Sequence, residues 1–196
     1  MDGNRHKRKT ERRPKKPLSP AQLHDLALSY AARYATSAAK LERYLQRKLY
    51  ERGWDEAAGS TPPDVAGLVA DFVAKGYVDD EAYARMRAGD LLRRGYGGAR
   101  VNQALGQAGI GEQVREDVAP GEAEKRRAAL HLAQKRRFGP FASQPVDREK
   151  REKAIAAMLR AGHTFDHARA VIDAETEDQA RRWLAEAEDW DDDSSL

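Results

Sequence analysis

Three glycines end three similar helical patterns in this sequence, and their recurrence constrains the fold more than any other feature. They lie roughly 50–55 residues apart, a spacing that is typical of helical arrays. Apolar residues stand four and eight positions before each glycine, as on one face of a helix that glycine then ends. The three sets are Leu45, Leu49 and Gly53; Val101, Leu105 and Gly109; and Ala154, Met158 and Gly162.

The recurrence predicts an all-α fold, built as an elongated tandem array of three three-helix repeats. The repeats are expected over residues 21–76, 77–120 and 121–174. A charged fraction of 34% argues against one thick core and favours an array that leaves much of its surface in water. Residues 1–20 are expected to be a disordered basic arm, and residues 175–196 an acidic extension that is frayed or separately helical. Chance recurrence in an ordinary helical protein is the alternative.

The most distinctive string is the junction at residues 76–81, which predicts a corner between two helices. Gly76 suits the end of the first helix, and Asp79 stands where its side chain would accept the free amide hydrogens of the second. Asp80 would add negative charge at the positive end of that helix, and Tyr77 would fill the corner. The residues of this structural motif are Gly76, Tyr77, Asp79, Asp80 and Tyr83.

Other helix boundaries can be read from local signals. Thr61 is expected to cap a helix whose first residue is a proline, and Asp147 to cap a later one. Helical spacing also predicts that Leu159 and Phe165 belong to the core.

Composition excludes several classes of protein. The chain has no cysteine, so disulfides and thiolate metal sites are ruled out. No apolar run approaches the roughly 20 residues of a membrane-spanning helix, and we expect a soluble, cytoplasmic protein. The net charge of +3 hides a basic beginning and an acidic end, a pattern of interaction-prone tails.

The sequence gives no support for an enzyme. Of its five histidines, only His163 and His167 are close, and a helix boundary between them argues against a shared metal site. The carboxylate pair Asp79 and Asp80 is better explained by helix capping than by acid–base catalysis. We therefore expect no catalytic residue, no metal and no cofactor.

The glycine-rich residues 95–98 precede a helix, so phosphate binding has to be considered. They lack the Lys-Ser/Thr pair of a nucleotide-binding loop, and an inter-helix turn is the preferred interpretation. Arg93, Arg94 and Arg100 flank the stretch, so exposed amides there could still grip a polyphosphate or an acidic protein.

Two basic clusters, residues 125–127 and 135–137, lie ten residues apart on one predicted helix. They would form an electrostatic strip roughly 15 Å long that faces phosphates or acidic side chains. A solvated helix face is the alternative. Aromatic side chains for stacking on single strands are sparse on these faces, with Tyr96 and Phe138 as the candidates, which argues against a protein that reads a nucleic-acid sequence. The tentative binding residues are Arg93, Arg94, Tyr96, Arg100, Lys125, Arg126, Arg127, Lys135, Arg136 and Arg137.

The order of these motifs resembles the RecX family of bacterial regulators. The string Gly-Tyr-Val-Asp-Asp-Glu-Ala-Tyr-Ala at residues 76–84 is similar to the central signature of the family. Residues 26–49, 95–110 and 150–166 look like its opening, second unit and close, so the resemblance covers roughly residues 21–174. Two positions depart from the family pattern: His163 replaces an aromatic residue and Ala161 replaces an arginine.

The resemblance implies a partner, the RecA recombinase in its filament on single-stranded DNA. It implies three related helical units and a protein that modulates, and is expected to inhibit, RecA ATP hydrolysis and strand exchange in DNA repair and the SOS response. A monomer is expected. The alternatives are a stand-alone, non-specific DNA-binding helical protein and a helical adaptor for another protein.

Overall fold

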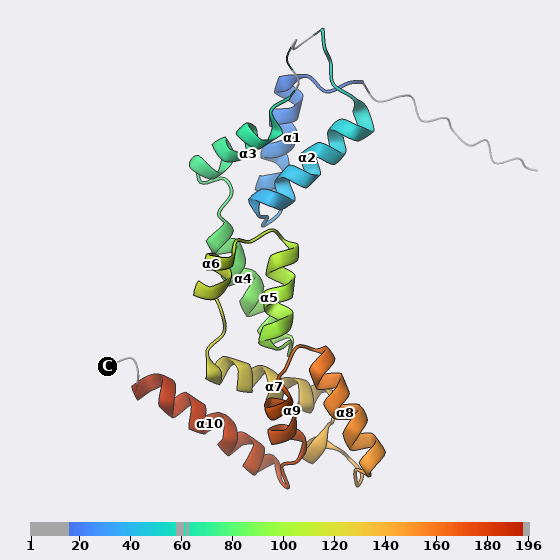
Figure 1. The fold of residues 1–196 in the computed structure, drawn as a ribbon, viewed down its shortest axis with the longest axis vertical. Coiled ribbons are helices and arrows are strands. Elements are labelled where there is room, and N and C mark those ends of the chain that lie inside the picture. Colours follow the sequence, from blue (N-terminus) through green and yellow to red (C-terminus); the bar gives the residue numbers. More distant parts are fainter. Residues whose placement is uncertain (1–15, 58–60, 62, 194–196) are drawn as a thin grey trace, which may run out of the picture. The chain divides into compact units, whose positions relative to one another are not determined.

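The computed structural model describes residues 16–57, 61 and 63–193, and these residues form ten α-helices and a short 3₁₀ helix without any strand (Figure 1). The all-α prediction is confirmed. The chain separates into two compact units. One contains the described residues up to Ala35 together with Lys40–Tyr77, and the other contains Thr36–Ala39 together with the described residues from Val78 onwards. Most of the predicted basic arm, residues 1–15, lies outside the described residues.

The first unit is built on helices α1 (Pro20–Arg33), α2 (Ala38–Arg52) and α3 (Val65–Ala74). The side chain of Ser19 caps α1 in a reciprocal capping box with Gln22. Tyr30 of α1 stacks on Tyr44 of α2, with ring centroids 4.1 Å apart. The buried apolar side chains of this unit include Leu23, Ala27, Leu41, Leu45, Val69 and Phe72.

The folded part of this unit begins before the predicted boundary at residue 20. Leu18 has no exposed surface, and its amide donates to the carbonyl oxygen of Gly53 at 2.9 Å. The amide of Asp55 in turn donates to the Leu18 carbonyl at 3.0 Å. Together the two hydrogen bonds make an isolated parallel β-bridge between Leu18 and Trp54. The prediction of disorder is therefore wrong for residues 16–20, where one leucine among prolines and lysines is enough to anchor the segment.

Helix α3 begins three residues later than the sequence indicated. Asp64, not Thr61, is its cap, and the Asp64 carboxylate accepts a hydrogen bond of 2.8 Å from the Gly67 amide. Proline disfavours helical backbone in the residue before it, so a pair of prolines puts the start of the helix after both.

The corner at residues 76–81 is largely as expected. Gly76 has a φ of +72°, and the Asp79 side chain accepts from the amide of Ala82 at 2.9 Å. Two details differ. Asp80 accepts a hydrogen bond of 2.8 Å from the amide of Ala38, the first residue of α2. Tyr77 is 52% exposed rather than filling the corner.

In the second unit, α4 (Asp80–Arg93), α5 (Gly98–Gln107) and α6 (Glu112–Asp117) enclose one apolar cluster. Tyr83, a residue of the corner motif, is buried in it beside Leu91, Val101 and Leu105. The hydroxyl of Ser37 donates to the carbonyl oxygen of Ala108 at 2.6 Å, which joins Thr36–Ala39 to this cluster.

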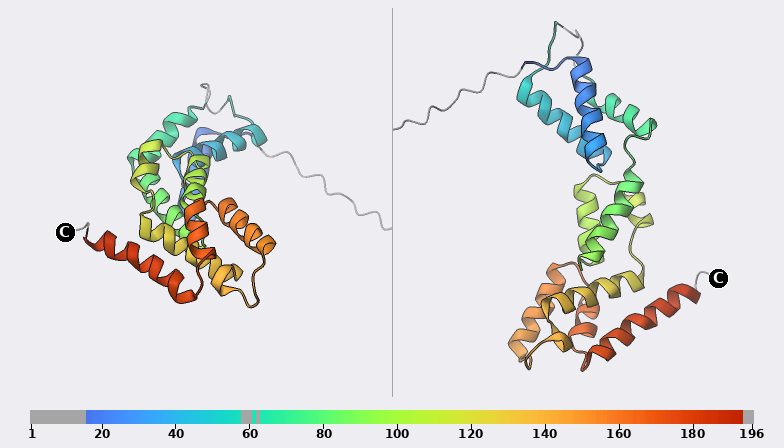
Figure 2. Two further views of the ribbon diagram at one scale, coloured as in Figure 1. Left: turned by 60° about the horizontal axis from the view of Figure 1, so that its bottom comes forward. Right: turned by 180° about the vertical axis from the view of Figure 1, so that it is seen from behind.

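A second cluster lies among α7 (Glu122–Arg136), the 3₁₀ helix η1 (Gly139–Phe141), α8 (Arg148–Arg160), α9 (Phe165–Ile172) and α10 (Glu177–Asp193). Asp147 caps α8 as predicted, accepting from the Lys150 amide at 2.8 Å. Leu159 and Phe165, predicted to be core, are 44% and 51% exposed. The acidic extension is a helix, α10, that packs along α7, as two views show (Figures 1 and 2).

The glycine recurrence is visible in the helices that it was expected to end. Gly53, Gly109 and Gly162 follow α2, α5 and α8 with φ angles of +80°, +81° and +94°. The residues eight before them, Leu45, Val101 and Ala154, are all buried. The division of the chain into three repeats at residues 76 and 120 stays a prediction.

Candidate functional site

The glycine-rich turn at residues 95–98 joins α4 to α5 and is hydrogen-bonded to the turn between α8 and α9. The amide of Gly97 donates to the Ala161 carbonyl at 2.9 Å, and that of Ala99 donates to the Gly162 carbonyl at 3.2 Å. Nε2 of the buried His163 lies 3.0 Å from the carbonyl oxygen of Gly95. The amides of Gly97 and Ala99 are therefore not free to grip a phosphate, and anion binding elsewhere in the turn stays a prediction. The inter-helix turn is confirmed.

The turn places Tyr96 at the edge of a hollow of about 300 Å³ beside the end of α7. We call this space the cationic hollow. Leu132, Ala157 and Ala161 form its apolar wall. Of the residues that the sequence singled out, it brings together Arg94, Tyr96, Lys135, Arg136 and the aromatic Phe138. Arg160 of α8 completes the set, and sequence reasoning missed it because it lies outside every basic run.

Within the described residues, most of the cations of this hollow have no acidic partner. Lys135, Arg136 and Arg160 are exposed, and none of the three forms an ion pair within the part of the chain that the structure describes. Arg94 is 3.6 Å from the carboxylate of Asp90, and its guanidinium lies 5.6 Å from the centre of the Tyr96 ring. Unpaired positive charge around half-buried aromatic rings can attract an anionic partner.

A second hollow, of about 440 Å³, adjoins the first, since Arg136 and Phe138 line both. Arg137, Lys150 and Lys153 add cations to its wall. Lys150 and Lys153 have acidic neighbours on or next to their own helix, at 3.7 Å and 2.5 Å. Arg137 follows the last residue of α7 in the left-handed conformation, with a φ of +54°. It is the sole non-glycine residue with a positive φ among those described. This residue caps the end of the helix, and Phe138, which follows it, lines both spaces.

The remaining predicted site residues lie elsewhere on the second unit. Arg93 and Arg127 line a separate space of about 320 Å³. Lys125 lines another, of about 370 Å³. Arg100 donates to the side chain of Gln103 at 2.7 Å. The two basic clusters of α7 therefore do not form one continuous exposed strip.

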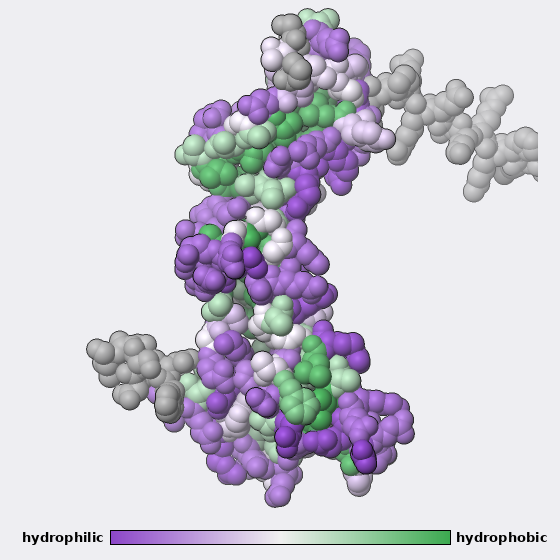
Figure 3. Space-filling model, viewed as in Figure 1, coloured by the Kyte–Doolittle hydropathy of each residue, from purple (hydrophilic) through white to green (hydrophobic). Residues whose placement is uncertain are grey.

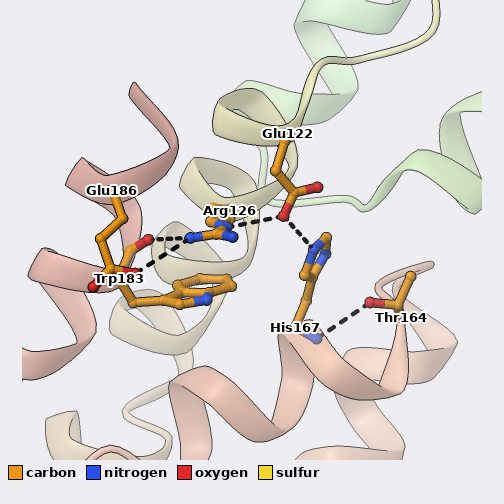
Figure 4. A network of polar contacts seen from close by, with 6 residues as sticks. All are labelled: Glu122, Arg126, Thr164, His167, Trp183 and Glu186. Carbon is orange, nitrogen blue, oxygen red and sulfur yellow. Dashed lines mark hydrogen bonds and ion pairs between the residues drawn. The ribbon is translucent and has the colours of Figure 1, made fainter. Parts of the chain in front are cut away.

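Arg126 is held by neighbours on several sides, as Figure 4 shows. It donates to Glu122 at 2.9 Å and to the backbone carbonyl of Trp183 at 2.6 Å, and Glu186 lies 3.8 Å away. Its guanidinium is 4.9 Å from the centre of the Trp183 ring. Arg127 forms an ion pair with Glu188 of α10. The structure thus ties the first basic cluster to the acidic helix.

Two side chains near this network have shifted acidities. Partial burial acts to raise the pKa of Glu122, but hydrogen bonds from Arg126 and His167 outweigh it and hold the pKa below its usual range. Burial lowers the pKa of His163, against the opposing effect of its hydrogen bond to Gly95. His167 contacts Glu122 at 3.0 Å and not His163, so each histidine has its own backbone or side-chain partner.

The described residues contain no group of three or more side chains placed to hold a metal ion. None of the helices described is both long enough and apolar enough to cross a membrane. Hydrophilic residues dominate the surface seen over the second unit, with an apolar area where α8 and α9 lie (Figure 3). Leu159 and Phe165 are the large exposed apolar side chains of those two helices.

Comparison with known proteins agrees with the fold. A family model described as RecX, second three-helix domain, matches residues 79–118. The crystal structure of RecX from Lactobacillus salivarius superposes with a TM-score of 0.59 and 17% identity, covering 84% of this chain and 96% of that one. A second structure, of regulatory protein RecX, gives a TM-score of 0.56 at 22% identity, covering 79% and 73%.

Two curated relatives extend the similarity to sequence. Regulatory protein RecX of Myxococcus xanthus is 38% identical over 176 residues, which are 85% of this chain and 94% of that protein. Regulatory protein RecX of Halorhodospira halophila is 30% identical over 139 residues, 71% of this chain and 81% of that protein. The chain therefore belongs to the RecX family of regulatory proteins.

Proposed function

We propose that this chain binds the RecA filament on single-stranded DNA and modulates RecA ATP hydrolysis and strand exchange, with inhibition as the expected effect. The observation that carries the proposal is the cationic hollow of a RecX-family protein, with Lys135, Arg136 and Arg160 free of acidic partners among the described residues. It acts without a catalytic residue or cofactor of its own. A cytoplasmic monomer stays a prediction.

The physical basis is differential binding. Cations around the two adjoining hollows can contact acidic or phosphate groups on neighbouring parts of a large assembly. A ligand that binds one state of such an assembly better than another shifts the population toward that state. The effect on ATP hydrolysis then follows without any chemistry on this chain.

Charge reversal at the end of α7 tests the contact. Lys135→Glu, Arg136→Glu and Arg137→Glu together are expected to weaken filament binding by about tenfold or more, because attraction becomes repulsion. The matched control reverses Arg47, Arg85 and Arg181, which are also exposed and each paired only within its own helix. Anisotropy of labelled RecA–DNA filaments gives the affinities. An unchanged affinity at low salt, with helicity intact, would remove these residues from the proposal.

A stand-alone DNA-binding function is the alternative, and the presence of Tyr96 and Phe138 beside unpaired cations favours it. RecA-dependent ATP hydrolysis on single-stranded DNA, titrated with this protein, separates the two. Inhibition by substoichiometric protein supports filament regulation, whereas inhibition only at DNA-saturating amounts supports competition for DNA. Absence of any effect on RecA or DNA would point to an adaptor for another protein.

A further inference from the structure

The two basic clusters of α7 differ in what covers them. Arg126 and Arg127 of the first cluster contact Glu186 and Glu188 of α10, whereas the second cluster, residues 135–137, has no acidic partner in the described part of the chain. Arg127 remains more than half exposed despite its ion pair. The same helix therefore presents one open cationic cluster and one in which two of the three cations are paired with α10.

Helix α10 is held in two different ways along its length. Its first half is anchored by apolar contacts: Ala180 is fully buried, and Trp183 and Leu184 pack against the second apolar cluster. In its second half, the described contacts are the two carboxylates on α7 and the small buried side chain of Ala187. Ion pairs at an exposed surface hold weakly and are screened by salt. Among the described side chains, residues 186–189 are thus held to α7 more weakly than residues 180–184, so they can separate from α7 first.

We propose that residues 186–189 of α10 are a displaceable acidic cover that competes with a single-stranded DNA backbone for Arg126 and Arg127 of α7. Glu188 pairs with the guanidinium of Arg127, which a phosphate would otherwise contact. Glu186 lies 3.8 Å from Arg126, which also has Glu122 and the Trp183 carbonyl as partners. Displacing the cover frees Arg127, which lies on α7 about 15 Å before the open cluster, a distance over which a nucleic-acid strand carries several phosphates. The cover limits direct DNA binding and leaves the cationic hollow free for other contacts.

This inference goes beyond the proposed function, because it concerns DNA binding by the protein alone. The test measures the affinity for a labelled 30-nucleotide oligo-dT by anisotropy, without RecA. Glu186→Gln with Glu188→Gln is expected to bind about fivefold more tightly than the unmodified protein, because two surface ion pairs no longer oppose the DNA. The matched control, Glu56→Gln with Glu81→Gln, changes net charge equally at exposed positions outside α10 and is expected to change affinity less than twofold.

A second variant keeps the test decisive if the first unfolds. A chain that ends at Ala185 keeps Ala180, Trp183 and Leu184 but lacks the cover, and it is expected to gain at least as much affinity. Equal affinities of the test and control variants, with α-helical circular dichroism preserved, would overturn the proposal. A gain for polyglutamate but not for oligo-dT would also overturn it, in favour of an acidic protein partner. The test contains no RecA, so its outcome does not depend on whether the proposed function is correct.

Discussion

At Gly97, two backbone segments approach more closely than any side chain permits. A Cβ atom there would stand 2.2 Å from the carbonyl oxygen of Gly162 and 2.5 Å from the amide nitrogen of His163. Gly162 has φ +94°, and a Cβ on it would lie 2.5 Å from the backbone nitrogen of Arg100. The close approach of Gly97 and Gly162 thus fixes the position of the turn whose Tyr96 lines the cationic hollow.

Adjacent glycines give a matched comparison. Gly97→Ala is expected to lower the free energy of unfolding by about 2–3 kcal/mol, because backbone must move to accept the methyl group. Gly98→Ala places its Cβ 3.5 Å from Pro120, an ordinary contact, and is expected to stay within about 0.5 kcal/mol of the parent protein. Urea unfolding measures both. Equal losses would show that the close approach is not rigid.

His163 is buried and neutral, which makes stability depend on pH. Its Nε2 contacts the Gly95 carbonyl and Nδ1 has no partner, so the neutral ring carries its proton on Nε2. Because burial lowers the folded-state pKa of His163, the unfolded chain binds more protons as pH falls below about 6.5. The contribution to stability is present above that pH and is lost as pH falls toward the folded-state pKa.

His163→Phe tests this sign. It removes the titration but keeps an aromatic ring, so the fall in unfolding free energy between pH 7 and pH 5 is expected to be shallower than in the parent protein. His131→Gln, at an exposed position, serves as the control for the loss of one imidazole. Urea titrations at several pH values provide the slopes. Parallel slopes for parent and His163→Phe would contradict the assignment.

At the level of the helices, the first amide of α2 is capped by a carboxylate from another helix, α4. Asp80 is the first residue of α4, and its carboxylate accepts from the amide of Ala38 at 2.8 Å. A free amide at a helix start needs an acceptor, and the positive end of the helix favours an anion.

Asp80→Ala is expected to cost about 1 kcal/mol of unfolding free energy through the loss of this cap. Asp80→Asn keeps an oxygen acceptor and loses only the charge, so it should cost less. Urea unfolding of both variants distinguishes the hydrogen bond from the helix-dipole effect. A loss in Asp80→Asn as large as that in Asp80→Ala would assign the effect to charge alone.

Sequence reasoning succeeded where the cause is local. Asp79 and Asp147 cap amides three residues away, and both were predicted correctly. The Asp80 contact spans 42 residues and the Ser37 contact 71, and no spacing rule links such positions. Phe165 fits the apolar stripe of α9 but is its first residue, at the edge of the packed face.

The same distinction holds for the site. Lys135 and Arg136 could be singled out because they form a basic run, and Tyr96 because it lies in a glycine-rich turn. Arg160 is separated from them in sequence and joins them only when α8 packs near α7. The contact of Arg126 with Trp183 depends on the packing of α10. Composition alone did not decide whether this segment is a frayed tail or a helix.

On the scale of the whole molecule, the boundary between basic arm and folded body lies before Leu18. A chain that begins at Lys16 serves as the reference, because it keeps the Leu18 contacts and the hydrogen bond from Arg52 to the Lys16 carbonyl. A chain lacking residues 1–20 loses the buried Leu18 and the Ser19 cap, and is expected to be about 2–4 kcal/mol less stable. Urea unfolding of the two truncated chains compares them. Equal stability would mean that Leu18 does not anchor the unit.

Arg136 and Phe138 stand in the wall between two neighbouring cavities, and this complicates the interpretation of mutational data. Replacing Arg160 or Lys150 alters one cavity, whereas replacing Arg136 alters both at once. Losses at Arg136 will therefore not add simply to losses at its neighbours. Coupling energies from double-mutant cycles, rather than scans of single substitutions, would reveal whether one ligand fills the two spaces together.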